Sequence, residues 1–273
     1  MTRVFLYILG ASQNPNNIEC SVPFLVNNSE IFFGPCKKRL REKLNEEYLK
    51  ISRSEYLLPK DDLYIVGANA RNRERIRKIV WAGKIQRLMT FEAAFHHLSA
   101  KRYREMIRHR HSPLHVKPLY NKKNVFIGYE HRSNLHSKND GWVVDLINSR
   151  HSPAVQHKGK RLLLLSRADK CQAFPRDCSF LLENIFFAQG HGVQITNEMV
   201  KLLKQVQPEI DKLDDYPIFG YRKHGSVEGL TGRWLEIMGA QGERFLSLIK
   251  SNLPVSRPLP KKSKRELKAC NCR

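Results

Sequence analysis

Leu63-Tyr64-Ile65-Val66-Gly67 and Ile79-Val80-Trp81-Ala82-Gly83-Lys84-Ile85 are two segments of the chain with strong strand character. Both are rich in β-branched and aromatic residues, which pack well on a pleated sheet. The residues between them, 68–78, are polar and rich in arginine. We therefore expect two sheet strands joined by a basic loop.

Other strands and helices are expected on both sides of this pair. Five more segments have strand character: Val4–Gly10, Glu30–Phe33, Val125–Tyr129, Gly141–Ile147 and Leu162–Ser166. Apolar residues at helical spacing predict helices over Lys37–Tyr48, Phe91–Ser99 with Thr90 as N-cap, Asn197–Leu213 and Gly232–Asn252. Because strands and helices do not alternate regularly, we expect an α+β fold with a mixed or largely antiparallel sheet and flanking helices.

Length and composition indicate one α+β domain with additions at its C-terminal end. The chain has 273 residues, of which 41% are hydrophobic, enough to bury a core. We expect the domain over residues 1–215, a helical extension packed on it over 216–253, and a basic, disordered tail over 254–273. The tail is either a solubilising segment or a basic arm that contacts phosphates.

The sequence shows no feature of a membrane or secreted protein. It has no run of about 18 apolar residues, and no cleavage signal follows the short apolar stretch near Met1. The six cysteines do not form a disulfide framework in a chain of this length. We expect a cytoplasmic protein that does not contact membranes.

Charge is the strongest indication of function. Lys and Arg number 48 against 26 Asp and Glu, a formal net charge of +22. This much like charge opposes the compact state through self-repulsion, whereas binding to a polyanion gains from it through counterion release. A nucleic-acid partner is therefore expected.

The basic residues form three clusters, within 37–43, 71–78 and 101–111. Such clusters typically contact phosphates, with a solvated basic face as the alternative. The alternating arginines of the second cluster would lie on one face of an extended segment. The residues expected to contact nucleic acid are Lys37, Arg39, Arg41, Arg73, Arg75, Arg77, Arg104 and Arg108. Tyr64 and Trp81 are candidates to stack on a base, with core packing as the alternative, favoured for Trp81.

Two residues are candidates for catalysis. His191 lies between Gly190 and Gly192, which would let the backbone approach a ligand while the imidazole acts as a general acid or base. Cys36 precedes two lysines that favour its thiolate form, as a nucleophile requires, or it is a small buried residue. No nucleotide-cofactor motif and no residues at metal-site spacing occur, so we expect neither a cofactor nor a metal.

Several segments, in order along the chain, resemble the nucleotide-modification-associated domain family, in particular its second type. The segments lie within residues 1–215 and are Gln13–Asn16, Cys36–Arg41, Asp61–Gly67, Ile79–Glu92, Arg161–Ser166 and Gln189–His191. The family favours proline where this chain has Lys38, and a glycine before the position of Asp62. The resemblance implies a protein of bacterial or phage DNA-modification systems without an assigned reaction. The strand–glycine–strand pattern is also similar to PUA-like modules, small barrels that grip modified or flipped bases.

The sequence thus predicts a nucleic-acid-binding protein, with DNA as the favoured partner, in a base-modification or defence system. The alternative is an enzyme that acts on a modified base or nucleotide, with His191 and Cys36 in its site. Both predictions depend on whether the basic clusters and residues Gln189–Gly192 share one surface.

Overall fold

The strands expected at 63–67 and 79–85 are antiparallel neighbours within the main sheet. They are β5 (Asp62–Ala68) and β6 (Lys78–Met89). The structure is a computed structural model. It describes residues 1–8, 23–34, 37–49, 56–68, 78–100, 116–131, 154–157, 160–164, 174, 176–187, 192–206, 220–223, 226–229 and 234–253.

The main sheet is mixed, with the strand order β15-β1-β5-β6-β11-β3-β2. Its other strands are β1 (Thr2–Ile8), β2 (Phe24–Leu25), β3 (Glu30–Phe33), β11 (Ser179–Phe187) and β15 (Leu235–Met238). Two short strands also pair with β6, namely β4 (Tyr56–Leu57) and β12 (Val193–Gln194). β1 and β5 are parallel, whereas the other described pairs are antiparallel. The carboxyl ends of β1 and β5 therefore lie at the same end of the sheet.

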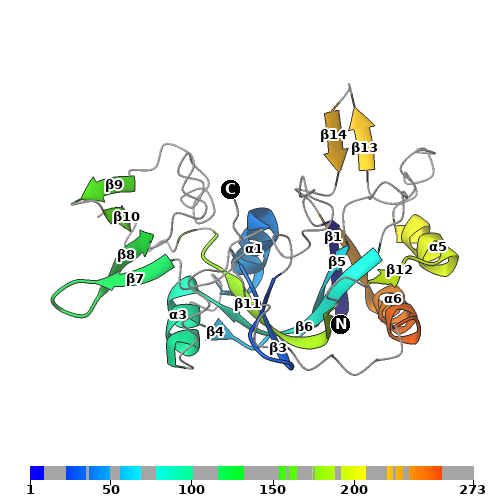
Figure 1. The fold of residues 1–273 in the computed structure, drawn as a ribbon, viewed down its shortest axis with the longest axis horizontal. Coiled ribbons are helices and arrows are strands. Elements are labelled where there is room, and N and C mark those ends of the chain that lie inside the picture. Colours follow the sequence, from blue (N-terminus) through cyan, green and yellow to red (C-terminus); the bar gives the residue numbers. More distant parts are fainter. Residues whose placement is uncertain are drawn as a thin grey trace, which may run out of the picture.

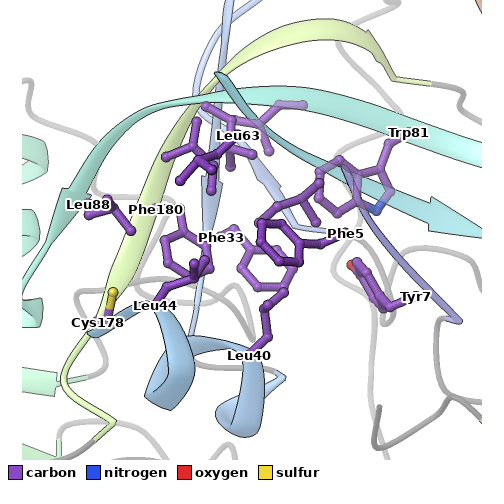
Figure 2. Close-up of a cluster of buried hydrophobic side chains, with 14 of the residues drawn as sticks. Phe5, Tyr7, Phe33, Leu40, Leu44, Leu63, Trp81, Leu88, Cys178 and Phe180 are labelled. Carbon is purple, nitrogen blue, oxygen red and sulfur yellow. The ribbon is translucent and has the colours of Figure 1, made fainter. Parts of the chain in front are cut away.

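Helices cover both faces of this sheet (Figure 1). On one face, Leu40 and Leu44 of the first helix pack on Phe5 and Phe33 (Figure 2). The opposite face, which includes Val4 of β1, is covered by two helices near the C-terminal end. Successive residues of a strand point to opposite faces, so β1 contributes to both cores. The helices are α1 (Lys38–Leu44) with a π-helical turn η2 (Asn45–Leu49), α5 (Asn197–Val206) and α6 (Gly239–Ser251).

A second, smaller sheet lies beside the main one and is antiparallel. Its order is β7-β8-β10-β9. Helix α3 (Phe91–Ala100) joins the two sheets, since its Phe91 and Leu98 share a core with Tyr129 and Leu163 of the second sheet. The remaining strands are β7 (Val116–Tyr120), β8 (Phe126–His131), β9 (Ala154–His157), β10 (Lys160–Leu164) and a separate hairpin of β13 (Gly220–Lys223) and β14 (Ser226–Gly229).

Two buried charged residues hold the junction of these layers. Arg41 of α1 has an exposed fraction of 0%, and its guanidinium donates hydrogen bonds to the backbone carbonyls of Arg176 and Cys178. The carboxylate of Asp177 accepts hydrogen bonds from the backbone N–H of Phe91, at 2.7 Å, and from the Tyr129 hydroxyl, at 2.6 Å. The segment before β11 is thereby bonded to α1, to the start of α3 and to β8.

The predicted α+β class, the mixed sheet and the flanking helices are confirmed. Thr90 caps α3 as predicted, because its hydroxyl accepts a hydrogen bond from the backbone N–H of Ala93 at 3.1 Å. Neither sheet closes into a barrel within the described part of the chain. The strand expected at 141–147 lies outside the described residues.

Two expectations about the C-terminal half and the core strands are corrected. The helix expected from Gly232 begins at Gly239, because residues 235–238 form β15 and pair with β1. The region 216–253 thus adds a strand to the main sheet as well as a helix. β11 was not predicted from the sequence, because its apolar run lacks the alternation that marks a half-buried strand.

No helix in the described ranges is both long enough and apolar enough to cross a membrane.

We expect Asp177→Asn to remove a pH dependence from stability. Burial raises the pKa of Asp177 from 3.8 to about 6. The folded state therefore binds this proton more tightly than the unfolded chain, and this residue's contribution to stability falls as pH rises from 3.8 to about 6. Two pKa units correspond to about 3 kcal/mol. Between pH 4 and pH 7, the free energy of unfolding of the variant should therefore rise by roughly this amount relative to that of the wild type. Urea unfolding at several pH values measures this difference.

Asp61→Asn is the matched control. Its carboxylate accepts a hydrogen bond from the N-terminal ammonium, which lowers the pKa of Asp61, so its contribution is lost as pH falls. The two variants should therefore shift the pH profile of unfolding in opposite directions. A difference between Asp177→Asn and the wild type that is constant from pH 4 to pH 7 would contradict the prediction.

Candidate functional site

The candidate site lies where β1 and β5 end and β6 begins. Tyr7, Gly67 and Trp81 are neighbours across these three strands. On the other edge of β6 from β5, Gly192 leads into β12, which pairs with the first residues of β6, Lys78 and Ile79. We call this region, defined by Tyr7, Gly67, Lys78, Trp81 and Gly192, the β1–β5 end.

The segments that the sequence analysis singled out attach to this region. Residues 9–22 follow β1, residues 69–77 join β5 to β6, and residues 188–191 join β11 to Gly192. Of the predicted site residues, those that lie outside the described part of the chain are Cys36, Arg73, Arg75, Arg77, Arg104, Arg108 and His191. The described residues on either side fix the points at which each of these segments begins and ends.

Lys37 places a cation at the β1–β5 end. Its ammonium nitrogen lies 4.6 Å from the centroid of the Tyr7 ring, a cation–π contact. Lys37 has a φ of 55°, in the left-handed region that non-glycine residues rarely adopt. It directly follows Cys36, so the chain next to the proposed nucleophile lies beside the end of β1.

Trp81 is a core residue, which confirms the alternative that the sequence favoured for it and excludes stacking of this ring on a base. Its exposed fraction is 0%, and its ring contacts those of Tyr7 and Phe33 at centroid distances of 5.9 and 5.8 Å (Figure 2). The indole lies directly against Gly67, where an added Cβ would be 2.2 Å from Nε1. Among the described residues, the buried indole N–H has no hydrogen-bond acceptor. An unmade hydrogen bond of this kind costs about 1–3 kcal/mol.

The prediction that Arg41 contacts a phosphate is wrong. Its guanidinium is buried and donates its hydrogen bonds to backbone carbonyls. Its neighbour Arg39 is exposed. Successive helical residues are about 100° apart, so two arginines two positions apart lie on nearly opposite sides of α1. Arg41 lies between the buried Leu40 and Leu44, and this spacing is the signal in the sequence that identifies it as a core residue.

Tyr64 lies on a different face of the sheet from Lys37. It packs against the core under α5 and α6, half-buried, and the ammonium of Lys84 lies 5.8 Å from its ring centroid. Burial raises the pKa of Tyr64. Stacking of Tyr64 on a base stays a prediction, and the fold does not bring this ring together with Lys37.

The third basic cluster attaches elsewhere. It follows α3, which begins at the opposite end of β6 from Lys78. Of the cluster within 37–43, Lys37 lies at the β1–β5 end, whereas Arg41 is bonded to the segment before β11 and Lys43 is ion-paired with Glu47. The cluster within 71–78 and residues Gln189–Gly192 adjoin the same end through Lys78 and Gly192. Arg104 and Arg108 belong to a chain segment between α3 and β7.

A scan against protein-family models and searches of curated proteins and of solved structures found no match to this chain. The resemblance to nucleotide-modification-associated domains therefore stays a prediction. Within the described ranges, no three His, Cys, Asp or Glu side chains are grouped so that they could hold a metal ion. The function has to be argued from the arrangement of the β1–β5 end.

We expect Trp81→Phe to cost far less stability than Trp81→Ala. The alanine variant loses a large buried ring, which typically costs about 3–5 kcal/mol. The phenylalanine variant keeps most of the packing and removes a buried N–H that has no acceptor among the described residues, which offsets part of the lost volume. Its cost should stay below about 2 kcal/mol in urea unfolding.

A double-mutant cycle with Gly67→Ala provides the control. The new methyl group would collide with Nε1, so Gly67→Ala should destabilise the wild type more than it destabilises Trp81→Phe. Additive effects of the two substitutions would show that the indole does not lie against residue 67.

Proposed function

We propose that this protein binds nucleic acid, with DNA as the favoured partner, in a base-modification or defence system, and that the β1–β5 end is its main contact. One observation carries this proposal. Lys37, the strand residues that flank the arginine-rich segment 69–77, and Gly192 all lie at one end of the sheet. A solvated basic face would not require Lys37 and the two ends of the arginine-rich segment, which are distant in the chain, to lie at the same end of the sheet.

The physical reason is electrostatic. The chain carries a net charge of +22, and concentrating cations at one place costs energy unless an anion neutralises them. A nucleic acid supplies closely spaced phosphates and releases condensed counterions on binding. With Arg41 removed from the set, the phosphate contacts we propose here are Lys37, Arg39, Arg73, Arg75 and Arg77.

The proposal predicts a steep salt dependence that the arginines of 71–77 control. Each phosphate contact contributes about −0.9 to the slope of log K against log salt concentration on duplex DNA, so five contacts give a slope of about −4.5. Arg73→Ala/Arg75→Ala/Arg77→Ala should make the slope shallower by about 3. Fluorescence anisotropy with a labelled 30-bp duplex between about 50 and 200 mM salt measures both values.

Lys201→Ala/Arg244→Ala/Lys250→Ala is the matched control. It removes the same charge from exposed positions on α5 and α6. This variant should keep a slope close to that of the wild type. Equal losses in the two triple variants, or a wild-type affinity that does not change with salt, would contradict a contact at the β1–β5 end.

A second candidate function, catalysis on a modified base or nucleotide, is supported by the same arrangement. Lys37, next to Cys36, lies over Tyr7 of β1, and Gly192, next to His191, lies against the first residues of β6. β5 and β6 both lie between β1 and β12, so three strand spacings, about 14 Å, separate these two positions. A substrate that touches both positions would be longer than one nucleotide.

If the protein is an enzyme, Cys36→Ser and His191→Ala should retain nucleic-acid binding and abolish conversion of a modified nucleotide, measured by chromatography of the products. Cys178→Ala is the control. Burial raises the pKa of the Cys178 thiol well above its usual range, so this residue is not a nucleophile. Unchanged conversion in both site variants would exclude the catalytic roles.

A further inference from the structure

The hairpin of β7 and β8 ends in a cationic turn that the sequence analysis did not single out. The turn is Asn121-Lys122-Lys123-Asn124-Val125, which we call the β7–β8 tip. All five residues are exposed, and none is acidic. The hairpin points away from the main sheet and its tip is an outlying part of the molecule, at the left of Figure 1.

The backbone of the tip is held by its own hydrogen bonds. The Asn121 side chain accepts hydrogen bonds from the backbone N–H groups of Lys123 and Val125, at 2.9 and 3.0 Å. The Asn121 N–H donates to the Val125 carbonyl at 2.9 Å, and Asn124 takes a φ of 56° to complete the turn. Asn tolerates this conformation better than most residues. The two lysines are therefore carried on a defined turn.

The base of the hairpin is fixed to α3. The Tyr120 hydroxyl, at the end of β7, donates a hydrogen bond to the Glu92 carboxylate and lies 2.6 Å from Nε2 of His96. On β8, the Tyr129 hydroxyl bonds to Asp177 and accepts a hydrogen bond from the backbone N–H of Glu92. These bonds hold the tip in one position relative to the main sheet.

The charges of the tip are not compensated locally. Neither Lys122 nor Lys123 has an ion-pair partner among the described residues. The acid of the hairpin, Glu130, lies opposite Lys117, away from the tip. Val125, with an exposed fraction of 55%, adds an apolar contact beside the two ammonium groups. A phosphate backbone, with charge and apolar sugar side by side, matches this composition.

The tip and the β1–β5 end lie at opposite ends of β6. β6 begins at Lys78 in the β1–β5 end and finishes at Met89, just before Thr90 and α3. Its 12 residues span up to about 40 Å at about 3.3 Å per residue. A ligand that touches both regions must therefore be a polymer, since this distance corresponds to roughly ten or more nucleotides at 3.4 Å each.

We infer that the β7–β8 tip is a second phosphate contact, and that the ligand is a polynucleotide running from the β1–β5 end to the tip. The inference rests on the proposed nucleic-acid binding and names the class of ligand. A mononucleotide or a short oligonucleotide would occupy the β1–β5 end without reaching Lys122 and Lys123.

The test compares ligand lengths. Dissociation constants for labelled oligonucleotides of about 5, 10, 20 and 30 nucleotides or base pairs are measured by anisotropy at one salt concentration, for the wild type and Lys122→Glu/Lys123→Glu. Wild-type affinity should rise with length up to 10–20 nucleotides, beyond the statistical gain from extra sites. The variant should lose on the order of tenfold or more for the 20-mer and 30-mer and keep its affinity for the 5-mer.

The control is Lys201→Glu/Lys250→Glu, which makes the same charge change at exposed positions on α5 and α6 and should bind every length nearly as the wild type does. Because both tip lysines are exposed, the thermal unfolding of the tip variant should match the wild type, which separates lost binding from lost folding.

The outcomes are distinguishable. A wild type that binds no nucleic acid of any length refutes the proposed function. A wild type that binds, with a tip variant equal to it at every length, leaves the proposed function standing and refutes the tip contact. An equal loss for the 5-mer and the 30-mer also refutes it, since the tip would then act through general charge.

Discussion

The layers of this protein depend on two buried charged residues, Arg41 of α1 and Asp177 of the segment before β11, which bond to groups on neighbouring elements. A charged side chain leaves water only if hydrogen bonds replace its hydration, so each of these residues fixes the segments around it. Arg41 holds α1 to the segment before β11, and Asp177 holds the start of α3 and the tyrosine of β8. Removing one partner of such a set typically costs about 3–5 kcal/mol, because the other group remains buried and uncompensated.

This junction also separates Lys37 at the β1–β5 end from Lys122 and Lys123 at the β7–β8 tip. β6 runs from the β1–β5 end to the junction, and α3 continues from there to the second sheet. The parallel pair β1 and β5 brings the ends of two strands together at one end of β6. The tyrosines of the hairpin place the β7–β8 tip at the other.

Local pattern predicted much of the fold. β3, β5, β6 and α3 lie where strand composition, helical spacing and an N-cap threonine place them, because those signals involve neighbouring residues. β11 was missed because its apolar run fits a buried strand or a buried helix equally well. Residues 235–238 have helical spacing with the residues after them, yet they form a strand that pairs with β1, far away in the chain. A side-chain hydrogen bond between Arg3 and Glu236, 233 residues apart, adds to this pairing. For the site, the sequence favoured core packing for Trp81, which the structure confirms, but cluster composition misassigned the buried Arg41 as a phosphate contact.

Charge, strand composition and helix periodicity are properties of residues close together in the chain, so the sequence was sufficient for a basic protein of the α+β class. A polyanionic partner stays a prediction. Solvent exposure is a property of packing between distant segments. The burial of Arg41 beneath the start of β11, the position of Trp81 against Gly67, and the position of Lys37 and Gly192 at the β1–β5 end follow from tertiary packing and from which strands pair. Strand order depends on contacts between residues far apart in the chain, which no local pattern encodes.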